Sequence, residues 1–191
     1  MGSKLLLNIC CGPCAIPVVD YLKNRCALQD VSLYFYAPNL YPAEEFTRRL
    51  EAASRVAAFY GVELITGPHE HEAWLEYLNN NLSRHPREYP ENGARCLACF
   101  AFRIDRSIAC AKACGFNQFG MTLSVSRHKD TGFINTYSEM SAAGSRINYV
   151  RFELDPVRAH QLGTEIAKKN SIYRQKYCGC EFSLNRGSSP E

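Results

Sequence analysis

The sequence contains no long hydrophobic run, no marked excess of charge of one sign, no internal repeat and no low-complexity tract. Because no stretch of about 18 apolar residues occurs, we expect neither a transmembrane helix nor a membrane partner. The apolar segment near the N-terminus is too short for a secretion signal, so we expect a cytoplasmic protein. The net charge of +3 (22 basic and 19 acidic residues) is compatible with an RNA partner but does not indicate one.

A common phosphate-binding signature is also missing, since no G-x-x-x-x-G-K-S/T motif occurs in the chain. Such a loop would follow the first expected strand, where the sequence instead reads NICCGPCAIP over residues 8–17. Cys11 and Cys14 flank a Gly-Pro pair, as in a thioredoxin-like dithiol, but Cys10 has no place in that motif. The first junction between a strand and a helix is therefore built around three thiols.

The length and composition are those of an ordinary globular protein. With 191 residues, 46% of them hydrophobic and 21% charged, the chain can bury a substantial core. No linker interrupts it, so we expect a single domain over residues 1–191. We expect a cysteine-bearing segment near the C-terminus, followed by a flexible tail at 184–191.

Segments typical of strands alternate with segments typical of amphipathic helices. The expected strands are 4–9, 31–36, 62–65, 118–123 and 147–151, and the expected helices are 14–24, 42–60, 71–79, 97–113, 130–142 and 156–173. This alternation predicts an α/β fold with a mostly parallel sheet and helices on both faces. Ligands of such folds bind at the carboxyl ends of the strands, where the loops after Ile9, Tyr36 and Leu123 are expected.

Ten cysteines are many for a protein expected in a reducing compartment, where they indicate metal binding or redox chemistry rather than structural disulfides. They form three groups and three single positions: Cys10, Cys11 and Cys14; Cys96 and Cys99; Cys178 and Cys180; and Cys26, Cys110 and Cys114. The three single cysteines lie in or beside expected helices, so we interpret them as small buried apolar residues.

The first two groups allow more than one interpretation. A thioredoxin-like dithiol at Cys11 and Cys14 leaves the other groups unexplained. The pairs Cys11/Cys14 and Cys96/Cys99 match the spacing of a structural zinc site, which gives Cys10 no role. In an iron–sulfur cluster the irons are separate, so neighbouring Cys10 and Cys11 could bind two of them while Cys96 and Cys99 supply two further thiolates.

The third group, in YCGCEFS, favours redox chemistry. A disulfide between Cys178 and Cys180 would close a small, strained ring, and Gly179 would relieve the backbone. Because strain makes such a bond easy to reduce, the pair is better suited to carrying two electrons than to holding the fold together. A metal-binding C-terminal tail is the alternative.

Five segments together resemble, in the same order, the epoxyqueuosine reductases of the QueH type. They are LLLNICCGPCA, YAPNLYPAEEFTRRL, RCLACFAFRI, MTLSVSRHKD and YRQKYCGCEFS. The resemblance covers roughly residues 4–183, and the combination of CC-x2-C, C-x2-C and YCGC-x-F-S is specific. Gly12 stands where that family often has alanine, and Asn8 where it often has histidine.

The resemblance implies an iron–sulfur enzyme of tRNA modification with a nucleotide-hydrolase-like (HUP-type) α/β fold. The implied reaction reduces epoxyqueuosine to queuosine at the wobble position of tRNAs with GUN anticodons, those for tyrosine, histidine, asparagine and aspartate. Its implied cofactor is a 4Fe–4S cluster bound by Cys10, Cys11, Cys96 and Cys99. Cys178 and Cys180 are implied as a redox-active disulfide pair, re-reduced by an external electron donor.

A second, mononuclear metal, iron by the same resemblance, is also implied near the cluster, with Cys14 and Asp155 as candidate ligands. Removal of an epoxide oxygen needs an acid, for which His128, Asp130 and Asp155 are candidates. Candidate phosphate contacts are Arg48, Arg49, Arg55, Arg127, His128, Lys129, Arg158, Lys168, Lys169, Arg174 and Lys176. Candidate stacking residues for an extruded base are Tyr36, Tyr41, Tyr89 and Phe133.

Two other functions remain open from the sequence. The first is a zinc-stabilised RNA-binding module without catalysis, for which one zinc and no visible absorbance are expected. The second is a cluster-dependent sulfur-transfer enzyme acting on tRNA, which is expected to carry the ATP-binding glycine-rich loop that CCGPC replaces here.

Overall fold

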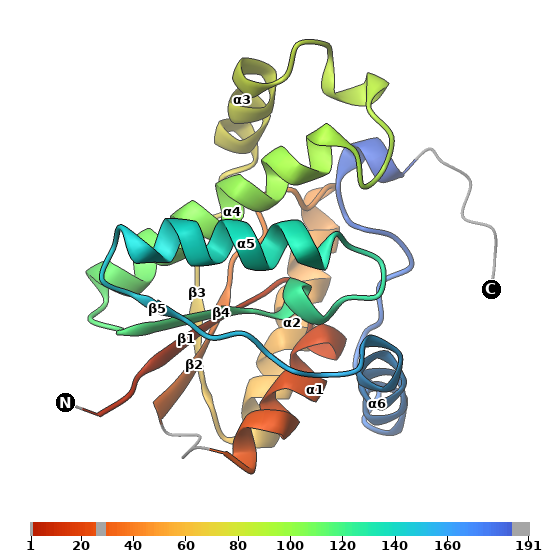
Figure 1. Cartoon of the computed structure of the whole chain (residues 1–191). Coiled ribbons are helices and arrows are strands. Elements are labelled where there is room, and N and C mark those ends of the chain that lie inside the picture. Colours follow the sequence, from red (N-terminus) through yellow and green to blue (C-terminus); the bar gives the residue numbers. More distant parts are fainter. Residues whose placement is uncertain (1, 26–29, 185–191) are drawn as a thin grey trace.

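The structure, a computed structural model, describes residues 2–25 and 30–184. Cys26 and, apart from Leu184, the expected tail at 184–191 lie outside the described residues. Within these ranges, five parallel strands form one sheet in the order β3-β2-β1-β4-β5 (Figure 1). The strands are β1 (Leu5–Ile9), β2 (Val31–Phe35), β3 (Glu63–Thr66), β4 (Gln118–Met121) and β5 (Asn148–Tyr149).

Helices cover both faces of this sheet (Figure 1). In the described ranges they are α1 (Gly12–Lys23), α2 (Ala43–Tyr60), α3 (His71–Asn81), α4 (Ala94–Ala113), α5 (Thr131–Ala143) and α6 (Pro156–Lys169). Helix α1 packs between α2 and α6 on one side, whereas α4 packs against α3 and α5 on the other. The predicted α/β fold with a parallel sheet between two helical layers is confirmed.

The strand order determines where a ligand can bind. The chain runs outward from β1 through β2 to β3 and then returns through α3 and α4 to β4, on the other side of β1. The connections that leave β1 and β4 therefore diverge onto opposite faces of the sheet. In doubly wound folds a crevice opens between two such strands, outside their carboxyl ends.

The central strands follow from their composition. Every residue of β1 and β2 is buried, as expected for strands covered on both faces. Asn8 is the polar exception in β1, and its amide nitrogen donates to the carbonyl oxygen of Tyr36 at 3.2 Å. This hydrogen bond satisfies the polar side chain within the buried strand.

Two glycines let α1 lie close to both neighbouring helices. A Cβ on Gly12 would lie 2.6 Å from the carbonyl oxygen of Ala52 on α2, and a Cβ on Gly163 of α6 would lie 2.4 Å from that of Pro13. Real Cβ atoms do not approach carbonyl oxygens so closely. Glycine at position 12 therefore permits the close contact between α1 and α2.

Several boundaries differ from the sequence expectation. Strand β4 ends at Met121 because the chain turns there into a short 3-10 helix, η3 (Thr122–Val125), where the Ser124 hydroxyl donates to the Met121 carbonyl at 2.7 Å. Helix α4 begins at Ala94 rather than at residue 97, with Gly93 as its N-cap. Helix α6 ends at Lys169 rather than at residue 173.

None of the helices in the described ranges is both long and apolar enough to span a membrane.

Candidate functional site

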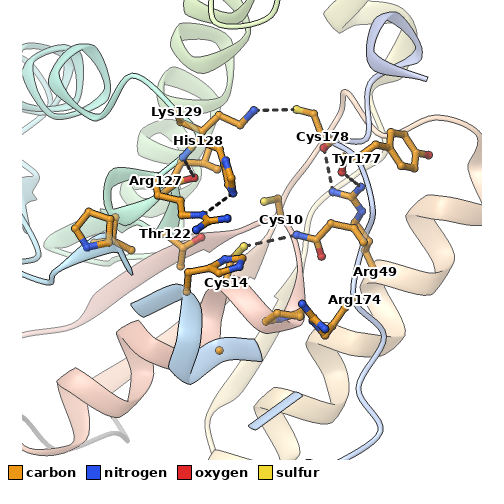
Figure 2. A pocket seen from close by; sticks show the side chains of 18 of the residues that line it. Cys10, Cys14, Arg49, Thr122, Arg127, His128, Lys129, Arg174, Tyr177 and Cys178 are labelled. Carbon is orange, nitrogen blue, oxygen red and sulfur yellow. Dashed lines mark hydrogen bonds between the residues drawn. The ribbon is translucent and has the colours of Figure 1, made fainter. Parts of the chain in front are cut away.

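A cavity of about 700 Å³ opens at the carboxyl ends of β1 and β4, where the strand order predicts a ligand (Figure 2). Cys10 follows the last residue of β1 and Thr122 follows the last residue of β4, and both line it. Cys14, Cys99 and Cys178 also line this cavity. Thiols from all three sequence groups therefore meet in one place, although they are up to 168 residues apart in the chain.

The first thiol group caps the start of α1. Cys10 and Cys11 are buried, with 8% and 1% of their surface exposed, and Cys11 is the N-cap of the helix. Hydrogen bonds from Cys11 and Cys14 lower the pKa of Cys10, assisted by the charges of Arg103 and Arg49. The bond to Cys10, together with burial, raises the pKa of Cys14 to about 12. Cys10 is thus the thiol of this group that most readily becomes a thiolate.

Gln175 joins the C-terminal segment to this group. Its amide nitrogen donates to Cys11 Sγ at 3.0 Å and lies 3.7 Å from Cys14 Sγ. Its amide oxygen is buried and has no hydrogen-bond partner among the described residues. Nothing in the sequence pattern singled out Gln175.

The second thiol group lies in the first turns of α4. Cys96 and Cys99 are buried, and the backbone N–H of Asn92 donates to Cys96 Sγ at 3.3 Å. Burial raises the pKa of Cys99 to about 12, and the charge of Arg103 opposes this shift. A thiol buried in this way becomes a stable thiolate only with a positive partner such as a metal ion.

Arg103 links the two thiol groups. It is 3% exposed and lines the cavity, and its charge lowers the pKa of both Cys10 and Cys99. Its Nη2 donates to the side-chain oxygen of Asn8 at 2.9 Å, while its Nε has no hydrogen-bond acceptor among the described residues. Cysteine spacing alone did not single out Arg103, although Arg103 follows Cys96 and Cys99 at the i+7 and i+4 spacing of one helix face.

The third thiol group is held by Arg49 of α2 (Figure 2). Arg49 is 1% exposed and donates to Glu45 Oε1 at 2.7 Å, to the carbonyl oxygen of Cys178 at 3.1 Å and to that of Tyr177 at 3.0 Å. The expectation that Arg49 binds RNA phosphate is therefore wrong, because its guanidinium is buried and engaged within the protein.

Gly179 allows the chain to pass between Arg49 and Leu40. Its φ is +108°, and a Cβ there would lie 2.4 Å from Leu40 Cδ2 and 2.8 Å from Arg49 Nη2. Its carbonyl oxygen accepts a hydrogen bond from the backbone N–H of Tyr41 at 2.8 Å. The backbone freedom that the sequence predicted for Gly179 is used here for close packing against α2 and its preceding loop.

Cys178 and Cys180, the predicted redox pair, are free thiols in the structure. Cys178 is half-buried and lines the cavity, whereas Cys180 is buried. A hydrogen bond with Cys180 lowers the pKa of Cys178 to about 6, and the charge of Lys129 acts in the same direction against burial. The same hydrogen bond and burial raise the pKa of Cys180. The two thiols are therefore electrostatically different.

The two candidate aspartates cap helices. Asp155 accepts a hydrogen bond from the backbone N–H of Arg158 at 2.7 Å at the start of α6, and Asp130 accepts one from Phe133 at 2.9 Å at the start of α5. Asp155 does not line the cavity that Cys14 borders. In the described ranges, no three His, Cys, Asp or Glu side chains gather closely enough to hold one metal ion.

His128 does border the cavity, and its Nε2 accepts a hydrogen bond from Arg127 Nε at 3.0 Å. Arg127, Arg174 and Lys176 are exposed and also line the cavity, so part of the expected basic surface surrounds its opening.

The candidate stacking residues separate by exposure. Tyr36 is 1% exposed, and its hydroxyl donates to Glu70 at 2.7 Å, so it belongs to the core rather than to a base-binding surface. Tyr89 is also buried, and Phe133 stacks on Tyr137. Tyr41 is 45% exposed.

Among the single cysteines, Cys114 is exposed and Cys110 is half-buried, so the expectation that these two are buried apolar residues is wrong for Cys114.

A doubly wound parallel sheet with thiols from three segments around one cavity defines a cysteine-based α/β protein suited to metal or redox chemistry. Sequence comparisons identify the family to which this protein belongs. The family model of epoxyqueuosine reductase QueH matches residues 5–186. The chain belongs to this family, whose members are oxidoreductases.

Curated relatives agree with this assignment. The epoxyqueuosine reductase QueH of Acinetobacter baylyi is 32% identical over 184 residues, which cover 96% of this chain and 81% of the relative. That of Dehalococcoides mccartyi is 32% identical over 183 residues, covering 96% and 93%. That of Histophilus somni is 31% identical over 183 residues, covering 95% and 72%.

Proposed function

We propose that this protein reduces the epoxide of epoxyqueuosine to the alkene of queuosine at the wobble position of tRNA. The observation that carries the proposal is that one cavity at the carboxyl ends of β1 and β4 is lined by thiols from three separate groups, namely Cys10, Cys14, Cys99 and Cys178. Family membership names the substrate, and the thiols supply groups suited to a reduction. We propose tRNAs with GUN anticodons, those for tyrosine, histidine, asparagine and aspartate.

We propose that Cys10, Cys11, Cys96 and Cys99 hold a 4Fe–4S cluster. The donor set fits such a group, because all four thiols are buried and thiolates are the usual ligands of iron–sulfur clusters. The unpartnered Nε of Arg103, beside Cys10 and Cys99, is a buried donor that a negatively charged thiolate cluster would satisfy. When bound, the cluster would relay electrons from the dithiol and offer an iron able to accept the epoxide oxygen as a Lewis acid.

A second, mononuclear iron is part of the same proposal, with Cys14 and Asp155 as its ligands. Cys14 borders the cavity and receives a contact from Gln175. Asp155 reaches such a site only if its carboxylate leaves the N-terminus of α6. Of the two, Cys14 is the ligand that the geometry supports.

The chain's own dithiol balances the reaction. Conversion of an epoxide to an alkene consumes two electrons and two protons and releases the oxygen as water. Oxidation of Cys178 and Cys180 to a disulfide releases two electrons and two protons, so one dithiol matches one turnover. Cys178 faces the cavity, and His128 borders it as a candidate proton donor to the departing oxygen.

The surroundings of the cavity suit a nucleotide drawn out of an RNA loop. A volume of about 700 Å³ is within the range of small-molecule sites. Arg127, Arg174 and Lys176 at its lining offer charges for backbone phosphates. Tyr41, with 45% of its surface exposed, is the most accessible of the candidate residues for stacking on a base.

The test is conversion of epoxyqueuosine in tRNA, measured by mass spectrometry of the digested nucleosides after incubation with anaerobically purified protein and a reductant. We expect queuosine from the wild type and from Cys110→Ser, which removes a thiol outside the cavity. We expect Cys178→Ser to keep its iron and its brown colour but to produce no queuosine. Full activity of Cys178→Ser would remove the dithiol from the reaction, and the absence of queuosine with iron-loaded wild type would refute the proposed function.

A further inference from the structure

The two thiols of the C-terminal pair differ in their access to the cavity. Cys178 is half-buried and lines it, while Cys180 is 6% exposed and is not part of its lining. The Cys180 thiol lies 3.5 Å from the hydroxyl of Ser183, which in turn donates to the Cys180 carbonyl at 2.7 Å. A reagent that enters from solvent therefore meets the sulfur of Cys178 first.

Lys129 is placed against this accessible sulfur. Its Nζ lies 3.5 Å from Cys178 Sγ (Figure 2). The same Nζ lies 3.1 Å from Glu91 Oε1. The Lys129 side chain is only 10% exposed, whereas that of Glu91 is 41% exposed. Burial disfavours the ammonium, but the charges of Cys178 and Glu91 outweigh this and raise the pKa of Lys129. A positive charge is thus held beside one member of the pair.

Lys129 and Glu91 also border a second, more open cavity of about 610 Å³, formed with Asn92, Arg127, His128 and Asp130. They belong to the lining of both cavities, so they form part of the wall between them. The sulfur of Cys178 is therefore one side chain away from a hollow that is open to solvent. An external molecule can approach it from this side.

We propose that an external dithiol re-reduces the Cys178–Cys180 disulfide by thiol–disulfide exchange at Cys178. In this proposal Lys129, held by Glu91, is the positioning residue for the exchange. This inference rests on the proposed function, which leaves Cys178 and Cys180 as a disulfide after each turnover. It assigns unequal roles to the two cysteines and names the chemical class of the electron donor.

The exchange balances in two steps. A donor thiolate attacks Cys178 Sγ, a donor–Cys178 disulfide forms, and Cys180 leaves as a thiolate that takes up a proton. The second donor thiol then attacks the donor sulfur of this mixed disulfide, and Cys178 leaves as a thiolate. The donor is oxidised to its disulfide, and the protein regains its dithiol.

The charge of Lys129 favours the second step. A thiol with a lower pKa leaves more readily from a disulfide, and a cation beside the departing sulfur stabilises the thiolate. The hydrogen bond with Cys180 is the largest cause of the lowered pKa of Cys178, about 6, and the charge of Lys129 acts in the same direction. Access decides which sulfur of the disulfide the donor attacks, because Cys180 is buried and does not line the cavity, whereas Cys178 does.

The experiment uses the anaerobically purified full-length protein, without tRNA, and 5,5′-dithiobis(2-nitrobenzoate) as the disulfide probe. Mass spectrometry of peptides after an acid quench locates the probe on each cysteine. In Cys180→Ser we expect a stable adduct on Cys178, and in Cys178→Ser we expect Cys180 to react at least about tenfold more slowly. In the wild type, Cys178 should carry the probe before Cys180 does, so the order of the two cysteines can be measured without a substitution.

Lys129 is tested in the Cys180→Ser background. Lys129→Met should slow the labelling of Cys178 by about tenfold at pH 6, and Lys129→Arg should largely restore the rate because it keeps the charge. Equal labelling of Cys178 and Cys180, or unchanged labelling in Lys129→Met, would overturn the inference. Because the assay needs no tRNA, a protein that passes it but makes no queuosine refutes the proposed function and leaves the cysteine order standing.

Discussion

The substitution Gly179→Ala tests how closely the redox pair is held against α2. The structure places a Cβ at this position 2.4 Å from Leu40 Cδ2 and 2.8 Å from Arg49 Nη2, so at least one of these groups has to move. Displacement of Arg49 would break its bonds to the carbonyl oxygens of Tyr177 and Cys178.

The expected cost follows from two contributions. A left-handed φ of +108° costs alanine about 1–2 kcal/mol relative to glycine. Loss of a hydrogen bond from a charged donor costs about 1.5–3 kcal/mol. We therefore expect Gly179→Ala to lower the free energy of unfolding by about 2.5–5 kcal/mol.

Guanidinium chloride unfolding followed by tryptophan fluorescence measures this change. Trp74 is the single tryptophan, it is 1% exposed, and its ring lies 5.9 Å from that of Phe182, next to the redox pair. Gly61→Ala is the matched control, because Gly61 has a φ of +64° but nothing within 4 Å of a Cβ. We expect it to cost only about 1–2 kcal/mol. Equal losses in the two variants would refute the packing argument at Gly179.

Two further predictions concern the same segment. Arg49→Met should lower the free energy of unfolding by about 3–5 kcal/mol, because it leaves the buried Glu45 carboxylate without its cation; a loss below about 1 kcal/mol by the same denaturation assay would contradict this. The rate of Cys178 alkylation by iodoacetamide should rise with pH through a midpoint of about 6, because the thiolate is the reactive form and the bond to Cys180 lowers its pKa. Cys180→Ala removes that bond and should move the midpoint to higher pH, whereas a wild-type midpoint near that of a free cysteine, about 8.5, would contradict the interpretation.

The fold was largely predictable because its determinants are local. Helix α2 shows this well: Glu44 and Glu45 lie in its first turn, and Gly61, with a φ of +64°, ends it. The end of β4 was not predictable, because Thr122 and Leu123 continue the apolar pattern of the strand and only the turn at Ser124 stops it. The apolar pattern of a strand does not by itself predict where such a turn begins.

The site was predictable to the extent that cysteine spacing and the strand order define it. The residues that hold the thiols were not, because their contacts join distant parts of the chain. Arg49 contacts the carbonyl oxygens of Tyr177 and Cys178, which lie 128 and 129 positions further along the chain. Gln175 contacts Cys11, which lies 164 positions before it. Contacts between such distant residues leave no periodic pattern in the sequence. For this reason Arg49, a buried structural arginine, was predicted as a surface charge that contacts phosphate.

The central claim is that the first and second thiol groups together hold an iron–sulfur cluster in the cavity. Iron and acid-labile sulfide per chain after anaerobic purification test it most directly, with Cys99→Ser as the disruptive variant and Cys110→Ser as the control on the same helix. We expect about four sulfides and at least as many irons in the wild type and in Cys110→Ser, and a marked loss of both in Cys99→Ser. Zinc without sulfide in the wild type, or full iron and sulfide in Cys99→Ser, would contradict the account.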